Sequence, residues 1–345
     1  MGKIVKGRIL VTGGLGYIGS HTCVELIRSG YEVSIIDNLV NSERFILDRI
    51  EKITGEKIDF YEIDITDLTQ TMICFNNKKF DLVIHFAALK SVNESIKFPD
   101  RYFKNNVGSV ENILKCIKSE DVKGFVFSSS CTVYGQPDIL PVTESSPFKK
   151  AESPYAETKQ ICEKIIKEFA IINKKPSISL RYFNPVGAHD SGLIGELPRG
   201  VPDNLVPFIT QTAIGKREKL KVFGDDYSTK DGTPVRDYIH VVDLAEAHVS
   251  AVDRLMNEET NESYEFFNIG TGKGYSVLEV IKSFERVNKV QLPYDIVGRR
   301  QGDIESIYSD NKFSKQTLNW RASRDLDQMM KSAWIWEKKL KKTVS

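Results

Sequence analysis

The sequence predicts an α/β protein with a doubly wound parallel sheet, followed by a smaller and more irregular substrate-binding domain. Short apolar segments alternate with helical stretches through the first half of the chain, as in βαβ units. A glycine-rich turn separates the first strand from the first helix, where such sheets bind nucleotides. At 345 residues the chain suits about two domains. We assign residues 1–185 to the first and 186–345 to the second, with some later segments packing back onto the first.

The elements follow from apolar patterning. Ile18, Cys23, Leu26 and Ile27 recur at helical spacing after the glycine turn, and Gly30 is a typical helix stop. After about residue 185, Pro and Gly become dense and the regular alternation ends, which indicates a region built around a ligand. The predicted strands cover 8–11, 32–36, 59–63, 82–86, 125–127 and 178–180.

Composition excludes several classes of function. Lys and Arg total 48 against 47 Asp and Glu, a net charge of +1, so no broad basic surface exists for nucleic acid or an anionic membrane. No apolar run approaches the 18 residues of a membrane span. Five scattered cysteines predict no disulfide framework and favour the cytoplasm. The five histidines lack metal-ligand spacing, so we expect no metal site.

The glycine turn matches a dinucleotide-binding fingerprint. Gly13, Gly16 and Gly19 allow a tight turn and a close backbone approach, and the helix N-terminus then faces a pyrophosphate. Asp37 ends the second strand, where a carboxylate accepts hydrogen bonds from a ribose diol and favours NAD over NADP. The alternatives are a purely structural turn and an Asp that only begins the next turn. Later strand ends add further candidates for the cofactor site: Asp64, Ile65, Phe86, Ala87, Ala88, Leu89, Lys90 and Asn105.

A second segment carries candidate catalytic groups. Ser153 and Pro154 are typical of a helix start, which places Tyr155 and Lys159 one turn apart on one helix face. A free phenol has a pKa of about 10, and a nearby ammonium together with the helix N-terminus favours the phenolate. Ser130 follows the fifth predicted strand and is placed to hydrogen-bond a reacting oxygen. The alternatives are a chance spacing on a surface helix and a serine that only caps the strand.

Four motifs extend this interpretation. They are Thr12–His21, Phe127–Gly135, Arg181–His189 and Gly232–Val241. Together, from about residue 8 to about residue 335, the chain resembles the UDP-galactose 4-epimerase family of the extended short-chain dehydrogenase/reductase superfamily. The resemblance implies a Rossmann-type NAD domain, a UDP-sugar substrate, a homodimer and a role in galactose metabolism.

The resemblance also implies roles for individual residues. Ser130, Tyr155 and Lys159 would carry the chemistry, with Phe183 at the junction of nicotinamide and sugar. The further NAD contacts would be Tyr17, Ile18, Asp37, Asn38, Leu39, Asn41, Ser42, Ser130, Tyr155, Lys159 and Phe183. The UDP-sugar contacts would be Lys90, Ser130, Tyr155, Phe183, Asn184, Asn204, Leu205, Arg236, Arg300, Asp303 and Ile307.

The implied reaction inverts the sugar at C4. Tyr155 would remove the 4-hydroxyl proton while the C4 hydride passes to NAD, which leaves a 4-keto sugar. This intermediate would turn about its diphosphate linkage and take the same hydride back on its other face. The product of UDP-galactose would be UDP-glucose, and the reverse reaction would follow the same path.

The chain departs from the family pattern at Ile307, where many bacterial members carry Tyr. The smaller side chain predicts a wider sugar pocket and some activity on UDP-GalNAc and UDP-GlcNAc. A 4,6-dehydratase would carry Asp-Glu where this sequence has Cys131 and Thr132. The remaining alternatives are a uronate epimerase or decarboxylase, a non-catalytic NAD and UDP-sugar sensor, and a structural scaffold that binds no cofactor.

Overall fold

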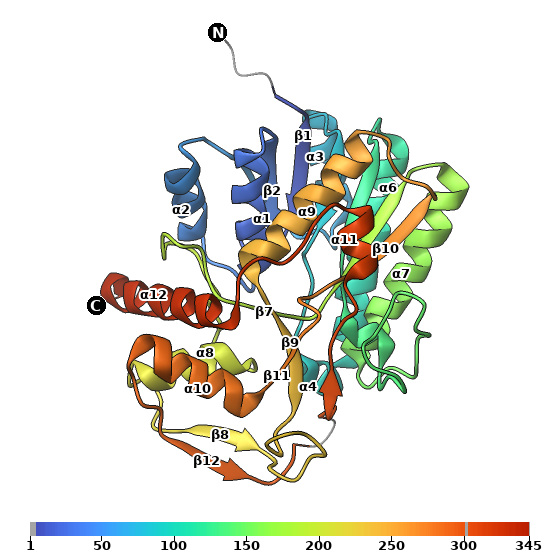
Figure 1. Ribbon diagram of the computed structural model, residues 1–345. Coiled ribbons are helices and arrows are strands. Elements are labelled where there is room, and N and C mark those ends of the chain that lie inside the picture. Colours follow the sequence, from blue (N-terminus) through green and yellow to red (C-terminus); the bar gives the residue numbers. More distant parts are fainter. Residues whose placement is uncertain (1–4, 301–302, 345) are drawn as a thin grey trace.

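A seven-stranded sheet forms the centre of the computed structural model, which describes residues 5–300 and 303–344 (Figure 1). The strand order is β10-β6-β5-β4-β1-β2-β3, and every neighbouring pair is parallel. The predicted α/β class with a doubly wound parallel sheet is therefore confirmed. The strands are β1 Arg8–Thr12, β2 Glu32–Asp37, β3 Asp59–Glu62, β4 Leu82–His85, β5 Gly124–Ser130, β6 Ser177–Tyr182 and β10 Tyr264–Ile269.

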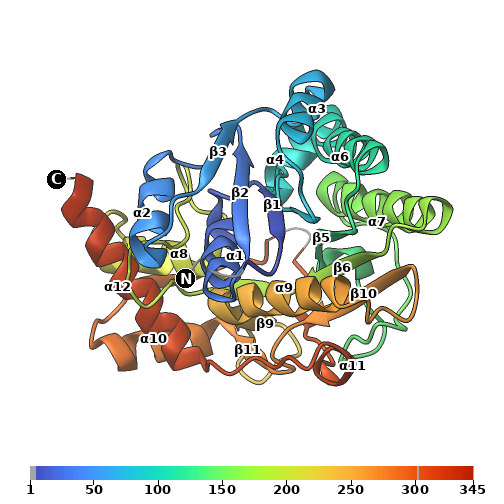
Figure 2. The same cartoon turned by 90° about the horizontal axis from the view of Figure 1, so that it is seen from above.

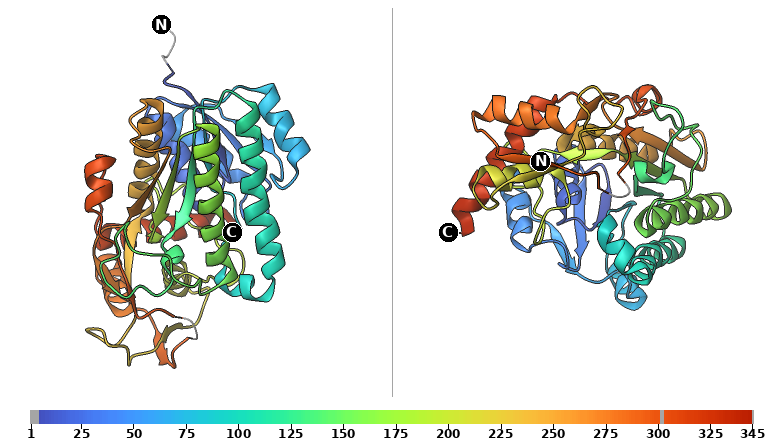
Figure 3. Two further views of the ribbon diagram at one scale, coloured as in Figure 1. Left: turned by 90° about the vertical axis from the view of Figure 1, so that its right-hand side faces the viewer. Right: turned by 90° about the horizontal axis from the view of Figure 1, so that it is seen from below.

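Helices cover both faces of this sheet (Figure 2). The central strand β4 is buried along its whole length, because βαβ crossovers place helices on either side of the sheet. In the left view of Figure 3, α9 in gold and α6 in teal lie on opposite sides. One face carries α1 Tyr17–Arg28, α2 Phe45–Thr54 and α9 Val241–Met256, and the other carries α3 Leu68–Asn77, α6 Gly108–Ser119 and α7 Pro154–Asn173.

The last strand of the sheet comes from late in the chain. β10 pairs with β6, and α9, which precedes it, packs on α1. The sequence pattern did not identify β10 as a strand. Segments beyond residue 185 thus contribute to the large sheet, and the boundary at 185 and 186 stays a prediction.

A smaller lobe lies beyond the carboxyl ends of the parallel strands (Figure 1). Its apolar core includes Phe284, Met329, Met330 and Trp334. Its strands are β7 Asn184–Val186, β8 Leu220–Phe223, β9 Val235–His240, β11 Gly274–Ser276, β12 Tyr294–Val297 and β13 Ser306–Ile307, and its helices are α8 Leu205–Ala213, α10 Val277–Asn288 and α12 Leu326–Val344.

Several short helices and helical turns lie between these longer elements. They are α4 Val92–Lys97, α5 Pro99–Tyr102, a π-helical turn at Phe103–Val107, a 3₁₀ turn at Cys131–Tyr134 and α11 Lys312–Thr317. Among the described residues, no helix is long and apolar enough to cross a membrane.

Asp237 on β9 ties the small lobe to the large sheet. Its fully buried carboxylate accepts hydrogen bonds from the backbone N–H and hydroxyl of Thr271, at 2.8 and 2.6 Å, just after β10. It also accepts from the Gly272 N–H at 3.1 Å and from the N–H and hydroxyl of Ser309, at 3.1 and 2.7 Å. One side chain thereby joins three segments, namely β9, the turn after β10 and the residues that follow β13.

We expect Asp237→Ala to lower the free energy of unfolding by about 3 kcal/mol or more. Each buried donor left without an acceptor costs about 1–3 kcal/mol, and the five bonds share this acceptor. Urea denaturation monitored by fluorescence measures the change. Asp226→Ala, which removes an exposed partner of Arg299, is the control and should leave the midpoint almost unchanged. Equal midpoints for the two variants would contradict the proposed link.

Candidate active site

Tyr155, Lys159 and Ser130 meet at the carboxyl edge of the large sheet. The Ser153 hydroxyl accepts from the Ala156 N–H at 3.2 Å and begins α7, so Tyr155 lies in its first turn. Ser130 ends β5, which runs three residues beyond the predicted strand 125–127, and its hydroxyl lowers the pKa of the Tyr155 phenol. The Lys159 ammonium donates to the Ser128 carbonyl at 2.6 Å and lies 5.9 Å from the centre of the Tyr155 ring. The predicted catalytic side chains are thus close neighbours.

The charge state of Tyr155 differs from the sequence-based expectation. Burial raises its pKa to about 12, and the hydrogen bond from Ser130 lowers it only in part. Burial also lowers the pKa of Lys159 to about 8. The ammonium donates to a carbonyl rather than to the phenol, so it does not offset the desolvation of the ring. The protein groups alone therefore keep Tyr155 protonated at neutral pH.

The glycine loop packs too closely against backbone atoms to carry side chains. Gly13 has φ +69°, and a Cβ there would lie 2.7 Å from the Ala87 backbone nitrogen. A Cβ on Gly19 would lie 2.3 Å from the Gly13 carbonyl oxygen. No side chain caps the N-terminus of α1 at Gly16, which leaves its first turn for a ligand. The tight glycine turn and the uncapped N-terminus of α1 together form a cradle that fits a dinucleotide pyrophosphate.

Asp37 joins the glycine loop to the segment that follows β2. Its carboxylate accepts from the N–H of Leu15 at 3.1 Å, the N–H of Leu39 at 3.0 Å and the hydroxyl of Ser42 at 2.7 Å. A carboxylate offers about four lone-pair sites, so acceptor capacity remains for a ribose hydroxyl. Asp37 thus builds the turn, as the alternative interpretation held, and still fits the cofactor role. Next to it, Asn38 donates to Asp64 at 3.3 Å.

Two unpredicted residues complete this side of the site. Arg199, from the segment after β7, donates to the carbonyls of Leu39 and Ser42 at 3.0 and 2.9 Å, which brings the small lobe against the cofactor loop. Asn106 hydrogen-bonds both backbone groups of Leu89 and the hydroxyl of Thr158 on α7. It lies in the π-helical turn beside Asn105. Such turns often mark functional sites but have no sequence signal.

The predicted substrate contacts form two groups. Lys90 and Asn204 both donate to Glu196, at 3.2 and 2.7 Å, and Glu196 was not predicted. Phe183 and Ile307 are buried in one apolar cluster with Cys131. The remaining contacts lie nearby in the small lobe: Asn184 begins β7, Leu205 begins α8, Arg236 pairs in register with Ile307, and Arg300 forms a 2.7 Å ion pair with Asp303.

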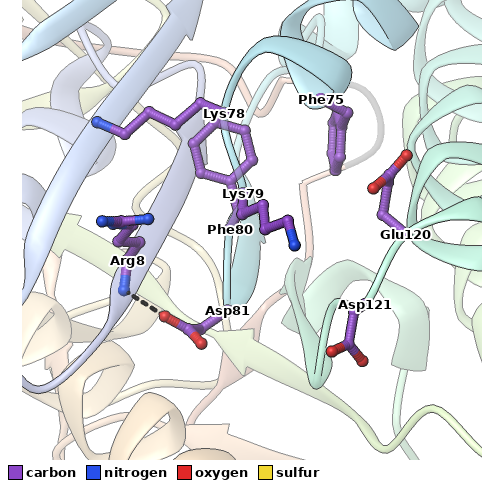
Figure 4. A pocket seen from close by; sticks show the side chains of 8 residues that line it. All are labelled: Arg8, Phe75, Lys78, Lys79, Phe80, Asp81, Glu120 and Asp121. Atoms are coloured by element: carbon purple, nitrogen blue, oxygen red, sulfur yellow. Dashed lines mark hydrogen bonds between the residues drawn. The ribbon is translucent and has the colours of Figure 1, made fainter.

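A separate hollow lies at the opposite, amino edge of the sheet (Figure 4). It has a volume of about 280 Å³, and charges of both signs surround it. None of the predicted site residues lines it, so it is distinct from the candidate active site. Its lining residues are Arg8, Phe75, Lys78, Lys79, Phe80, Asp81, Glu120 and Asp121.

Comparisons with known proteins agree with this geometry. A family model described as GDP-mannose 4,6 dehydratase matches residues 10–333. UDP-glucose 4-epimerase of Pasteurella multocida is 51% identical over 332 residues, 96% of this chain and 97% of that protein. The chain belongs to the UDP-glucose 4-epimerase family. This family lies within the extended short-chain dehydrogenase/reductases, as the motifs predicted.

Solved structures of the family share the whole fold. The Stenotrophomonas maltophila UDP-glucose 4-epimerase, with bound NAD and formylated UDP-arabinopyranose, has a TM-score of 0.94 and 44% identity over 98% of this chain and 99% of that chain. The Bifidobacterium longum enzyme, in complex with NAD+ and UDP, has a TM-score of 0.92 and 44% identity over 96% and 98%. Among the described residues of this UDP-glucose 4-epimerase family member, no cluster of His, Cys, Asp or Glu is suited to a metal.

We expect Asp37→Ala to release NAD from the purified protein. The substitution removes the acceptor that joins the glycine loop to Leu39, so both segments lose their relative position. NAD content per chain after extensive gel filtration measures the effect. Ser42→Ala, which removes only one of the three bonds, should retain most of its cofactor. Equal retention in Asp37→Ala and wild type would refute a cofactor role for Asp37.

Proposed function

We propose that this protein interconverts UDP-galactose and UDP-glucose by inverting C4 of the sugar. The observation that carries the proposal is the proximity of Ser130, Tyr155 and Lys159, whose ammonium lies 5.9 Å from the centre of the Tyr155 ring, at the same carboxyl edge of the sheet as the glycine loop. Family membership supports the same reaction, since the relatives named above are UDP-glucose 4-epimerases.

Three side chains of this protein have separate roles in the proposed proton transfer. NAD, when bound in the cradle, supplies a hydride acceptor that can also return the hydride. Tyr155, in its phenolate form, takes the proton from the sugar 4-hydroxyl and gives it back after the 4-keto sugar has turned. Ser130 hydrogen-bonds the same oxygen and holds it next to the phenol. Because the protein groups alone keep Tyr155 protonated, the phenolate would depend on the positive nicotinamide of bound NAD together with the charge of Lys159 beside the ring.

The two ends of the substrate are held differently. Arg236 and Arg300 supply guanidinium donors for a diphosphate, and Asn204 adds an amide. Around the sugar, Phe183 and Ile307 are apolar and form no directional bonds. This contrast anchors the nucleotide and leaves the sugar free to present either face.

We further propose a cytoplasmic homodimer. All five cysteines are buried free thiols, which suits a reducing compartment. Val92, Ile96 and Phe98 are exposed near α7 by 43, 60 and 55%, and a second copy would cover them. Light scattering during gel filtration tests the dimer.

Incubation of purified protein with UDP-galactose and no added nicotinamide tests the main proposal. We expect UDP-glucose as the product, because the cofactor is regenerated in each turnover. In deuterated water, the product should carry no deuterium at C4. A preparation that binds UDP-sugar without turnover would support the sensor alternative and overturn the proposal.

We expect Tyr155→Phe to lower turnover by about 10²–10⁴-fold, the usual contribution of a positioned acid–base group. The substitution removes one oxygen and keeps the ring, so the binding of NAD and UDP should persist. Initial rates on UDP-galactose, with NAD content as the control, measure the effect. Turnover near that of wild type would remove Tyr155 from the proposed role.

Ile307 favours activity on N-acetylated sugars as well. Its side chain is 3% exposed and faces the apolar cluster of Phe183 and Cys131. A structural neighbour with 35% identity and a TM-score of 0.83 is the Campylobacter jejuni UDP-Glc/GlcNAc 4-epimerase. It is matched over 96% of this chain and 99% of its own.

We expect Ile307→Tyr to abolish turnover of UDP-GlcNAc and to preserve turnover of UDP-galactose. The larger ring would fill the space that an N-acetyl group needs. Paired assays on the two substrates give the ratio of kcat/KM directly. Wild-type protein that leaves UDP-GlcNAc unchanged would refute the wider pocket and leave the main proposal intact.

A further inference from the structure

A buried ion pair lies one helical turn beyond Lys159. Arg181 on β6 donates from Nε to both oxygens of Glu163, at 2.9 and 3.2 Å, and from Nη2 to Oε2 at 2.5 Å. Both side chains are almost fully buried, with exposed fractions of 5 and 3%. Neither residue was predicted as part of the site, and neither takes part in the proton transfer described above.

We propose that the Glu163–Arg181 ion pair is a positioning element of the active site, which holds α7 in register with β5 and β6 so that Tyr155 and Lys159 stay beside Ser130. The inference rests on the proposed function. It adds Glu163 and Arg181 to the residues needed for the reaction, because they position the catalytic groups and do not touch the substrate.

Glu163 lies on the same face of α7 as the two catalytic residues of that helix. Tyr155, Lys159 and Glu163 follow one another at intervals of four residues, which puts them on three successive turns of one helix face. A rotation or slide of α7 that moved Glu163 would therefore move the phenol and the ammonium with it.

The hydrogen-bond partners of Glu163 lie on the strands next to α7. Its carboxylate accepts from the Ser129 hydroxyl at 2.5 Å, and the Tyr264 hydroxyl on β10 lies 3.1 Å away. Ser129 immediately precedes Ser130 and pairs in register with Arg181. One carboxylate thus connects the catalytic helix to three adjacent strands, at the residue before the catalytic serine.

The surroundings of Arg181 leave it little freedom. Its guanidinium carbon lies 4.0 Å from the centre of the Phe266 ring and 4.7 Å from that of Phe148, so it is sandwiched between aromatic faces. Its Nη1 donates to the Tyr134 hydroxyl at 2.9 Å. Tyr134 closes the 3₁₀ turn that follows Ser130, which links the pair to the other side of the serine.

The pair also acts on the charge of Lys159. The titratable groups that face this ammonium are Tyr155, Cys162 and Glu163 on α7 and His85 on β4. Burial lowers the pKa of Lys159 to about 8, and the negative charge of Glu163 opposes that shift. Loss of the Glu163 charge would lower the pKa of Lys159 further.

The chain contains a matched control pair. Arg254 on α9 donates to Glu265 on β10 through Nε and Nη2, at 2.7 and 2.8 Å, with exposed fractions of 8 and 9%. Its geometry and burial resemble those of the Glu163–Arg181 pair, but neither residue lies on α7 or beside Ser130. Breaking it should cost stability alone.

The test compares Glu163→Gln with Glu265→Gln in NAD-loaded full-length protein. For Glu163→Gln we expect kcat on UDP-galactose to fall by about 10²-fold, because a displacement near 1 Å costs about that much. KM should stay within about twofold, because the UDP contacts lie on other elements. The alkaline fall of kcat should move to lower pH, since a Lys159 with a lower pKa loses its proton earlier as pH rises. For Glu265→Gln, thermal stability should fall while kcat and the pH profile match wild type.

Arg181→Lys keeps the proposal testable if Glu163→Gln does not fold. Lys conserves the positive charge but cannot form the bidentate hydrogen bonds of a guanidinium. We therefore expect kcat to fall while the alkaline limb of the kcat–pH profile stays at the same pH. Unchanged kcat in Arg181→Lys, or equal behaviour of Glu163→Gln and Glu265→Gln, would overturn the positioning role. Wild-type protein that binds NAD but fails to turn over UDP-galactose would instead overturn the proposed function.

Discussion

The carboxyl edge of one parallel sheet is the constraint on which the rest of the molecule depends. Strand order reverses between β1 and β4, so the helices that follow these strands lie on opposite faces and leave a crevice between them. The glycine loop after β1 and the Phe86–Ala87 segment after β4 line that crevice at backbone distance. Ser130, at the end of the next strand, extends the same edge toward α7. Cofactor site and catalytic groups are adjacent because the strands that end in them are adjacent.

Much of this arrangement was predictable from the sequence, because its signals are local. The glycine spacing, the start of α7 at Ser153 and the one-turn separation of Tyr155 and Lys159 each depend on a few neighbouring residues. β10 was missed because Tyr264–Ile269 follows the irregular stretch, and only its pairing with β6 makes it a strand. Glu196, Arg199 and Arg181 were missed as site residues for a similar reason. Lys90, Leu39 and Glu163, which bond them, lie 106, 160 and 18 residues away in sequence, so no local spacing marks them.

The buried cations divide into two kinds. Arg181 and Arg254 are paired with Glu163 and Glu265, as burial requires. Lys159 is equally buried, but its nearest acceptor is the neutral Ser128 carbonyl. Its charge is therefore only partly compensated, and its pKa lies near 8. A lysine held this way stabilises new negative charge nearby better than one already neutralised by a carboxylate. The sequence showed Lys159 next to Tyr155, but desolvation of both groups depends on the packed structure.

The two walls of the site differ in a way that suits inversion better than dehydration. On one wall, the Thr132 N–H donates to the Ser130 hydroxyl, and the buried Glu163 joins α7 to β5 and β6. On the other, Phe183, Cys131 and Ile307 offer shape without directional bonds. A dehydratase needs an acid and a base beside the carbons next to C4, and burial raises the pKa of the Cys131 thiol to about 12, so it supplies neither. Cys131 and Thr132 stand where a dehydratase would carry its acid and base, which favours renewed reduction of a keto sugar over its dehydration.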